Sequence, residues 1–536
     1  MNSQMSRSDL EQERILTEKT LTDKAYDFTA KFLAVNYLQS LTESHPDVIN
    51  TETIAVLEQL LMDYEFRHQT QAYFMYKEVA NTLCSIIVHS DALAGHAFNS
   101  LKTLLGMTNG HPHRATAEAL GSLPFSIEGP EIREPAREDI PCITWHELIE
   151  ETGLSVTSSP IFIGRSLVAG VQPEGKLLAV KLVRSDEFLD SLVREAAWME
   201  YLSDRTHFFP VRFNIPRAIT VRGGYAFRLG GIPVSTPEDI GLHKENYAIC
   251  FVADDDYFSY PNDDREEKRL GNEEFSEVIL RNAWILGKLT SLGIVHSAPI
   301  PLFHNRVQRQ RRRDGGLYEW PRAGRLDRWL ESCLYPNLGL TGIRDFEHLE
   351  SFTGKSRNLY RHIGSHMLSL LLITGSFFRY KDGTRVGLDE EGRPVDARDL
   401  FDREFLKALI FEIFRNYYNG FTGDHFEGAF PTDLEAFSSR MIDEMGVDHH
   451  MEEILRVADQ NEMTDDEFKA FLERRGFSAG KIAAFQKGEQ DIIIYSGPHL
   501  GAFNNRISLP EMIELVGTMS SLCIAGRYCM KVPGLQ

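Results

Sequence analysis

The sequence predicts an α+β protein in which a strand-rich segment lies between two mainly helical segments. Apolar residues recur at helical spacing from residue 8 to about residue 124. From about residue 143, short apolar runs alternate with glycine turns, which is typical of strands. After an acidic stretch at 254–267, expected to be a solvated loop, the helical spacing returns and the chain is mainly helical to its end. The exceptions are 293–350, which is loop-like, and a strand-like run at 491–495.

The composition and charge favour a globular protein and disfavour nucleic-acid binding and a membrane span. The chain has 536 residues, of which 42% are hydrophobic and 25% charged, and this is enough for several globular domains. The formal charge of −21 disfavours binding to nucleic acid, whose affinity for proteins comes from cations, so no nucleic-acid partner is expected. The longest apolar run, 367–378, is shorter than the ~20 residues that span a bilayer and is expected to be a buried helix.

The cysteines and the N-terminal residues indicate the cellular compartment of the protein. The six cysteines are scattered and form no Cys-x-x-Cys pair, which favours a reducing compartment. The first residues are polar and contain no apolar segment of the kind found in cleaved secretory signals. We therefore expect a cytoplasmic protein with no membrane partner; export without a cleaved signal stays open.

The pattern divides the chain into four regions. The linker SIEGPEIREPAREDIP is rich in proline and glutamate and separates the first helices from the strands. Helix pairs in the first region resemble HEAT-type repeats, although their period is not clean. The predicted regions are an all-helical domain (1–130), a strand-rich lobe (143–255), a helical lobe (256–430) and a C-terminal helical extension (431–536).

The strand-rich lobe has the element order of a protein-kinase small lobe. Residues 160–184 predict two or three strands joined by glycine turns, and further strands are expected near 218–234 and 245–253. Between them, 185–204 predict one amphipathic helix with Ser185 as its N-cap. The apolar face of this helix comprises Leu189, Leu192, Val193, Ala196 and Met199.

A lysine at the end of one of these strands is the first candidate for chemistry. Lys181 ends the apolar run LLAVKLV after a glycine turn, where a lysine can hold the α- and β-phosphates of a nucleotide. The alternative is a solvated lysine on an edge strand. Glu195 follows 14 residues later beside the apolar face of the helix and could supply the counter-charge, with Glu200 as a weaker option.

Arg165 lies among three glycines, Gly164, Gly170 and Gly175. This segment could be a short loop that covers a phosphate, but it does not match Gly-x-Gly-x-x-Gly, and glycine turns between strands are common. Arg165 could therefore either reach a phosphate or lie on the surface.

Two later segments resemble kinase motifs. Gly293-Ile-Val-His296 is similar to the start of a catalytic loop, and Asp345-Phe346 is similar to the metal-binding Asp-Phe-Gly element, with Glu347 in place of glycine. A carboxylate at Asp345 could hold Mg²⁺ against the oxygens of ATP. Asn337 is the expected second ligand, and Asn305 is its rival.

The departure from a working kinase is specific. Two residues after His296, where a kinase has its catalytic aspartate, the chain has Ala298, and no carboxylate follows before Asp314. Without a base beside the substrate hydroxyl, ordinary transfer to serine or threonine should be poor.

The segment between these motifs holds a further group of polar residues. His304, Tyr318 and Arg325 could form a second anion site, because arginine offers a bidentate fork and tyrosine can stack on a base. The alternative is that they stabilise the loop. The arginines of 306–313 are more consistent with a solvated or partner-facing loop than with a nucleic-acid patch.

Over roughly residues 155–350 the chain resembles the SidJ-like pseudokinase glutamylases. The resemblance includes the Asn337-to-Asp345 spacing within PN-x-G-x-x-G-x-RD. The other matching residues are Arg165, Lys181, Glu195, His304 in FHNR, Tyr318 and Arg325 in GRLDRW.

This resemblance implies a bilobal kinase-like fold that binds ATP and Mg²⁺, adenylylates a carboxylate of a protein substrate and joins free glutamate to it. By analogy, Lys181, Glu195 and Asp345 would be catalytic, and Asn337 would bind metal together with Asp345. The analogy gives nucleotide binding to Arg165, Lys181, His304, Tyr318 and Arg325, the last three at a second, displaced nucleotide site.

Two departures accompany the resemblance. The chain has no IQ-type pattern, so calmodulin is not expected, although another protein activator is possible. His348 stands where a further carboxylate would be expected, which weakens the metal site. The leading hypothesis is an ATP-dependent adenylyl transferase that acts on a protein carboxylate. The alternative is a non-catalytic, ATP-binding scaffold that recruits a partner through its N-terminal helices and arginine-rich loop. A conventional kinase is third.

Overall fold

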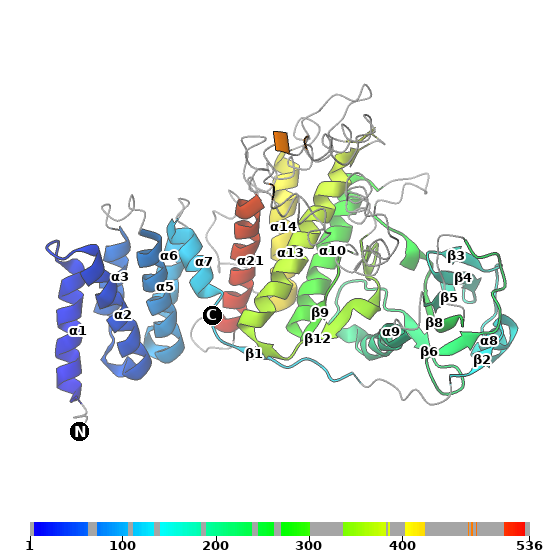
Figure 1. Cartoon of the computed structure of the whole chain (residues 1–536), viewed down its shortest axis with the longest axis horizontal. Coiled ribbons are helices and arrows are strands. Elements are labelled where there is room, and N and C mark those ends of the chain that lie inside the picture. The colour runs from blue at the N-terminus through cyan, green and yellow to red at the C-terminus, as the bar shows by residue number, and fades with distance from the viewer. Residues whose placement is uncertain are drawn as a thin grey trace.

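The computed structural model has mixed α and β structure (Figure 1). Among the residues it describes, no helix is long and apolar enough to cross a membrane. Those residues are 5–62, 72–105, 111–132, 140–183, 189–237, 245–261, 270–300, 336–381, 384–385, 403–423 and 509–530, with isolated positions between 470 and 479.

Figure 1 shows three groups of elements along the long axis of the molecule: N-terminal helices, a central set of long helices, and a sheet at the far end. The N-terminal group confirms the helices expected before residue 124, within the described ranges. Its helices are α1 (Arg7–Thr22), α2 (Phe28–Ser44), α3 (Thr51–Met62), α5 (Ala72–His89), α6 (Asp91–Leu105) and α7 (His111–Leu120).

Polar side chains fix the starts of the first two helices, as expected for N-caps. The Ser6 hydroxyl accepts a hydrogen bond from the backbone N–H of Asp9, and the Asp27 carboxylate does the same for Ala30. Helix α7 begins at His111, one residue before Pro112. Pro112 is compatible with this start because the first turn of a helix leaves its N–H groups unpaired in any case.

The strands predicted within 160–184, 218–234 and 245–253 form one seven-stranded sheet together with β2, which was not predicted. The strand order is β2-β7-β8-β5-β4-β3, and β6 also pairs with β8. The strands are β2 (Cys142–Ile143), β3 (Ile161–Ile163), β4 (Ser166–Val171), β5 (Lys176–Leu182), β6 (Arg217–Ile219), β7 (Phe227–Leu229) and β8 (Tyr247–Asp254), and helix α8 (Trp145–Thr152) follows β2.

Strand β5 lies inside this sheet and not at its edge. It pairs antiparallel with both β4 and β8, and Lys181 lies opposite Ser166 on one side and Ile249 on the other. The interpretation of Lys181 as a solvated edge-strand residue is therefore wrong. The turns before and after β4 use glycines with positive φ, Gly164 and Gly175, a conformation that glycine adopts without a Cβ clash.

Helix α9 (Leu189–Ser203) packs on the sheet through the face that the sequence predicted. Ser185, its expected cap, lies outside the described residues. The buried positions of this helix include all five predicted apolar residues, Leu189, Leu192, Val193, Ala196 and Met199, together with Glu195.

The segment after β8 was expected to be a solvated loop, and this is wrong for its first turn. Residues Asp255–Phe258 form a short 3₁₀ helix, η4, in which the Tyr257 side chain is buried. Its ring meets that of Phe251 edge to face, with 5.7 Å between centroids, and the guanidinium of Arg344 lies 5.5 Å from its centroid. Aromatic packing thus outweighs the three preceding aspartates.

Long helices and short strand pairs make up the central group. The run 367–378 lies in one of these helices, as predicted. The helices are α10 (Asn272–Ser291), α13 (Ser356–Arg379), α14 (Arg403–Thr422) and α21 (Leu509–Cys529). The strand pairs are β9 (Ile294–His296) with β12 (Leu349–Ser351), β10 (Leu338–Gly339) with β11 (Gly342–Ile343), β1 (Ser126–Ile127) with β13 (Gly354–Lys355) and β14 (Tyr380–Lys381) with β15 (Thr384–Arg385).

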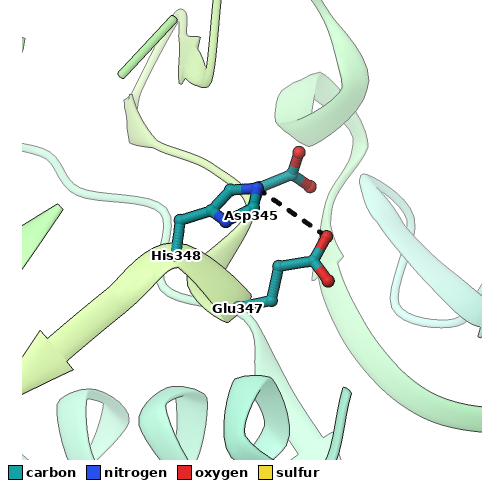
Figure 2. Close-up of side chains that lie close together, drawn as sticks. All are labelled: Asp345, Glu347 and His348. Atoms are coloured by element: carbon teal, nitrogen blue, oxygen red, sulfur yellow. Dashed lines mark ion pairs between the residues drawn. The ribbon is translucent and has the colours of Figure 1, made fainter. Parts of the chain in front are cut away.

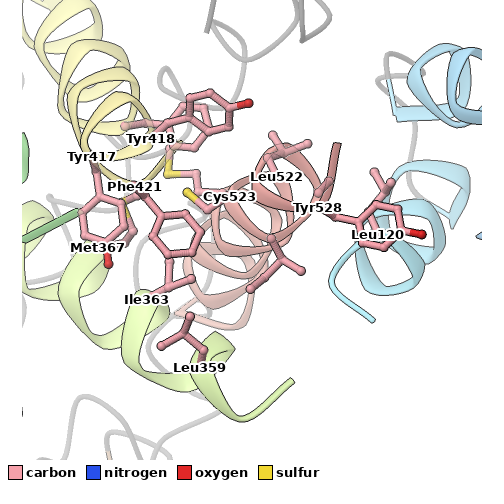
Figure 3. Packing of buried hydrophobic residues seen from close by; sticks show 14 of the residues in the cluster. Leu120, Leu359, Ile363, Met367, Tyr417, Tyr418, Phe421, Leu522, Cys523 and Tyr528 are labelled. Atoms are coloured by element: carbon pink, nitrogen blue, oxygen red, sulfur yellow. The ribbon is translucent and has the colours of Figure 1, made fainter. Parts of the chain in front are cut away.

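Helix α21 joins the N-terminal helices to the central group. It packs against α13 and α14 on one side and against α7 on the other. Figure 3 shows Leu522 and Cys523 between these helices and Tyr528 directed toward Leu120. The N- and C-terminal parts therefore share one apolar core. The strand-like run 491–495 lies outside the described residues.

Two glycines allow α10 and α14 to approach closely. A Cβ atom at Gly287 of α10 would overlap the carbonyl oxygen of Tyr417, and one at Gly420 of α14 would overlap that of Trp284. Backbone atoms cannot retreat as a flexible side chain can, so a larger residue at either position must separate the helices.

We expect Gly287→Ala to lower the free energy of unfolding by roughly 1–3 kcal/mol, because the added methyl group overpacks the contact between α10 and α14. Urea and thermal unfolding, followed by circular dichroism, would measure the change. Gly364→Ala in α13 is the matched control: its Cβ would lie 3.5 Å from the Ser520 hydroxyl, an ordinary contact. Alanine's better helix propensity should then stabilise α13 slightly. Equal effects of the two substitutions would contradict the packing argument.

Candidate functional site

The centre of the candidate site is the buried ammonium group of Lys181. Its Nζ lies 2.8 Å from Oε1 and 2.7 Å from Oε2 of Glu195 on α9. The structure thus chooses between the two glutamates that the sequence offered: Glu200 instead accepts a hydrogen bond from the Tyr225 hydroxyl. Only 6% of the Lys181 side chain and 1% of the Glu195 side chain are exposed, so each charge depends on the other for compensation.

Asp345 reaches the same lysine from the central group. Its Oδ1 lies 3.0 Å from Lys181 Nζ, although the two residues are 164 positions apart. Asp345 has a left-handed backbone, with φ 50° and ψ 66°, and precedes the 3₁₀ turn η6 (Phe346–His348). A residue with a Cβ adopts this conformation at a cost of order 1–3 kcal/mol, so its surroundings must hold it there.

Glu347 is a third carboxylate at Lys181, and it also binds Arg165. Its Oε1 lies 3.4 Å from Lys181 Nζ and forms an ion pair with Arg165 Nη2. Its other oxygen, Oε2, accepts a hydrogen bond of 3.1 Å from the hydroxyl of Ser191 on α9. The Arg165 side chain is 16% exposed, so it is not a free surface residue.

These five charged groups set one another's ionisation. Burial lowers the pKa of Lys181, but Asp345 and Glu195 outweigh it and the pKa is raised. Burial raises the pKa of Asp345 and of Glu347, but Lys181 and Arg165, together with His348, outweigh it and both pKa values are lowered. Burial raises the pKa of Glu195, and the other two carboxylates add to this effect against Lys181. Three carboxylates thus share two buried cations, and Arg344 also acts on Asp345.

Asp345, Glu347 and His348 form a group with the chemistry of metal ligands (Figure 2). Each offers one ligand atom, and the three atoms lie within 4.8 Å of one another. The His348 Nε2 is 3.9 Å from Glu347 Oε1. Asp345 is the most open of the three pairing partners of Lys181, with 39% of its side chain exposed, and an entering cation would therefore meet it first.

Asn337 immediately precedes the β10–β11 hairpin, and Asp345 lies two residues after it. The hairpin holds this spacing because the backbone N–H of Arg344 donates to the Asn337 carbonyl at 2.8 Å. The Asn337 amide nitrogen donates to the Ala298 carbonyl at 2.8 Å, which leaves the side-chain oxygen Oδ1 as its potential ligand atom. Ala298 itself is buried, and its methyl side chain cannot act as a base.

Two buried histidines, His296 and His366, link the carbonyl of Arg344, which precedes Asp345, to the long helices α13 and α14. Ala298 N–H donates to His296 Nδ1 at 3.2 Å, so the His296 proton lies on Nε2 and is donated to the Arg344 carbonyl at 2.9 Å. His366 donates from Nε2 to the His296 carbonyl at 2.9 Å, and its Nδ1 lies 3.0 Å from the Tyr417 hydroxyl. Helices α13 and α14 thereby position the segment that carries Asp345.

A separate cavity of about 690 Å³ borders α9. Arg194 and Trp198 contribute one wall, and residues 128–132 and the β12 segment contribute others. Lys181, Glu195 and Asp345 do not line it, so the charged cluster and this cavity are different places.

The structure brings together Arg165, Lys181, Glu195 and Asp345. Asn337 is joined to the residue before Asp345 by a backbone hydrogen bond, and no contact of its side chain with the cluster is seen among the described residues. His304, Tyr318, Arg325 and Asn305, the rival metal ligand, lie outside the described residues. Sequence reasoning missed Glu347, which it noted only as a replacement for glycine. A carboxylate two residues after a proposed metal ligand was the available signal.

The sequence also gave no hint of the His296–His366 contact, which joins residues 70 positions apart.

We expect Lys181→Met to lower the free energy of unfolding by roughly 3–5 kcal/mol, because it leaves buried carboxylates without their cation. Chemical denaturation of the full chain would measure it. Lys176→Met is the matched control on the same strand. Lys176 pairs with Asp254 but is 42% exposed, and its loss should cost within about 1 kcal/mol. A small effect at Lys181 would show that the cluster is not a buried charge network.

Acid should destabilise the fold through the buried histidines. Burial lowers the pKa of His366 from 6.5 to about 4, so the unfolded chain binds a proton more readily between these values. This stabilisation is complete above pH 6.5 and is lost as the pH falls toward 4. We expect the free energy of unfolding to drop by about 2 kcal/mol per such histidine between pH 7.5 and pH 5.

The His366→Gln variant should have a lower stability at neutral pH and a shallower loss on acidification, measured by urea unfolding at several pH values. His146→Gln is the control, because the His146 side chain is 85% exposed. An unchanged acid dependence in His366→Gln would contradict the assignment.

No protein-family model matches the sequence, and a search of curated proteins finds no significant match. The resemblance to pseudokinase glutamylases therefore rests on the residues and spacings of this chain alone. Together with the geometry of the charged cluster, these residues are the basis for the function proposed next.

Proposed function

We propose that the chain is a kinase-like ATP- and Mg²⁺-dependent enzyme of the SidJ-like glutamylase type. It would adenylylate a carboxylate of a protein substrate and join an amino acid, such as free glutamate, to that carboxylate. The sheet with α9 would form one lobe, and α10, α13 and α14 would form the core of the other. The observation that carries the proposal is the buried Lys181, held by Glu195 and Asp345 from two different parts of the chain.

Each residue of the cluster has a role that fits this chemistry. Lys181 and Arg165 would bind phosphate oxygens, and arginine's planar fork suits that contact. Glu195 would keep Lys181 charged and aimed into the site. Asp345 would hold Mg²⁺, together with Asn337. His304, Tyr318 and Arg325 complete the proposal as residues of a second nucleotide site.

Ala298 favours a carboxylate over a hydroxyl as the acceptor. A hydroxyl must lose a proton to become a good nucleophile, and the apolar Ala298 cannot accept one. A carboxylate is already ionised at neutral pH and needs a positioned phosphorus atom and charge stabilisation instead. The site offers cations for that purpose at Lys181 and Arg165.

The proposed reaction has two balanced steps. The acceptor carboxylate oxygen attacks the α-phosphorus of ATP, the bond to the β-phosphate breaks, and pyrophosphate leaves. The amine nitrogen of the incoming amino acid then attacks the acyl carbon, an amide bond forms, and AMP leaves while the amine loses a proton. Lys181 and Arg165 would neutralise the charge that develops on the phosphate oxygens in the first step.

The donor set suits Mg²⁺ in part. The low pKa of Asp345 and Glu347 keeps both carboxylates ionised, and carboxylate oxygens are ligands that Mg²⁺ prefers. The imidazole of His348 is a better ligand for transition metals. When bound, Mg²⁺ would neutralise phosphate charge and orient the α-phosphate. The two ionised carboxylates, Asp345 and Glu347, favour such a cation.

The second candidate function is a non-catalytic, ATP-binding scaffold. Among the described residues, six of the seven exposed large hydrophobic residues lie between residues 5 and 74, on or beside the first helices. They are Met5, Ile15, Leu16, Tyr26, Leu33 and Phe74. Such residues could bind a partner protein, and an activator or a protein substrate would suit the same surface. Tight ATP binding without AMP release would favour the scaffold.

We propose a cytoplasmic location for either function. Five of the six cysteines lie among the described residues, and all five are free thiols, as expected in a reducing compartment.

We expect the wild-type chain to convert ATP to AMP and pyrophosphate with Mg²⁺, and free glutamate to increase AMP release. Asp345→Asn should reduce AMP formation by at least about 100-fold, because a neutral amide holds a metal ion more weakly than a carboxylate, and the metal ion is what would neutralise the phosphate charge. Chromatography would separate AMP from ADP. Glu350→Gln, an exposed carboxylate on β12, is the control and should retain wild-type activity.

Formation of ADP that is lost in Asp345→Asn would replace the proposal with phosphoryl transfer. ATP binding without either product, in the presence of candidate protein substrates and activators, would support the scaffold.

A further inference from the structure

We propose that Glu347 is an internal competitor for the phosphate site, and that metal binding releases the site by drawing Glu347 away. The inference deepens the proposed function and rests on it for the identity of the ligand. It assigns a role to a residue that the sequence pattern did not predict, because a glycine is expected at this position of the Asp-Phe-Gly element.

The contacts of Glu347 are those that a bound phosphate would make. Its carboxylate forms an ion pair with Arg165, lies 3.4 Å from the Lys181 ammonium and accepts a hydrogen bond of 3.1 Å from the Ser191 hydroxyl. Arg165 lies in the β3–β4 turn, Lys181 on β5 and Ser191 on α9. Three elements therefore contact one carboxylate. Its side chain is only 8% exposed.

A phosphate that takes these same donors of Arg165, Lys181 and Ser191 must therefore displace this carboxylate. The cations and the hydroxyl are donors, and Glu347 already occupies them. Because ligand affinity falls in proportion to the fraction of protein in the binding-competent state, the closed arrangement lowers the apparent affinity for polyphosphate.

A divalent cation offers Glu347 an alternative partner. Glu347 shares the 4.8 Å group of potential ligand atoms with Asp345 and His348. If a cation bound at Asp345 recruits the Glu347 carboxylate, Arg165 and part of the Lys181 charge become available to phosphate. Metal and phosphate would then strengthen each other's binding beyond their direct attraction, because both favour the open arrangement.

This arrangement explains why one chain would hold three carboxylates around two cations. Glu195 stays on Lys181 in either state, since its side chain is 1% exposed and lies on α9. Asp345 has the most exposed side chain of the three carboxylates, so it is the one that would bind the metal first. Glu347 is the carboxylate that can exchange one set of partners for another.

The test compares binding of inorganic tripolyphosphate and of ATP to the full chain, by calorimetry, in EDTA and in Mg²⁺. In EDTA, Glu347→Gln should bind both ligands roughly tenfold more tightly than wild type, because the competing charge is gone. Mg²⁺ should then improve binding less in Glu347→Gln than in wild type. Glu350→Gln, which removes the same charge three residues away, should behave as wild type.

Two further variants sharpen the result. In Arg165→Ala, the Glu347→Gln substitution should give a much smaller gain, because one of the released cations is missing. Glu347→Asp keeps the charge on a side chain one methylene shorter and should give an intermediate affinity; it carries the test if Glu347→Gln does not fold, as judged by its thermal unfolding.

Equal or weaker tripolyphosphate binding by a folded Glu347 variant in EDTA would overturn the inference, as would an equal Mg²⁺ effect in the variant and wild type. No detectable binding to any variant would overturn it as well. Tighter binding by Glu347→Gln, without AMP formation by any protein, would retain the Glu347 competition and reject only the adenylyl transfer.

Discussion

The buried ammonium group of Lys181 is the constraint on which the described site depends. It sits on a central strand, where it has no access to bulk water, and a charge in such a place is stable only beside opposite charges. Glu195 can provide one only if α9 packs on the sheet, and Asp345 only if the central group closes on α9. One lysine thus links the sheet, its helix and the segment that follows the β10–β11 hairpin.

The long helices contribute to the site at a distance. Asp345 has a left-handed backbone that a free chain would rarely adopt. The preceding carbonyl, of Arg344, is held by His296, which is held in turn by His366 between α13 and α14. Two neutral, buried imidazoles are stable there because each ring nitrogen has a partner. The apolar core that holds these helices, including α21, is therefore part of what positions Asp345 (Figure 3).

The charge balance of the cluster suggests how binding and chemistry are connected in the proposed enzyme. Two cations, Lys181 and Arg165, are available to hold a phosphate, and three carboxylates surround them. A metal ion would bind among these carboxylates, and a nucleotide brings one with it. The choice between the cations and such a metal ion makes Glu347 mobile between partners in the proposal, whereas deep burial fixes Glu195. A site without a base at Ala298 then relies on charge and position for its chemistry.

The sequence by itself determined the helical and strand-rich regions and the buried face of α9, and it offered Glu195, with Glu200 as the weaker option, as the partner of Lys181. These depend on local periodicity, since burial repeats with the period of the element and places residues of neighbouring elements at a fixed spacing. Only the tertiary structure decided that Lys181 is interior, that Glu347 binds Arg165 182 positions away, and that His366 supports His296. Such contacts depend on how whole layers pack together, and no local pattern records that. The left-handed Asp345 and the buried Tyr257 follow from the same packing, which overrides the preferences of the short segments that contain them.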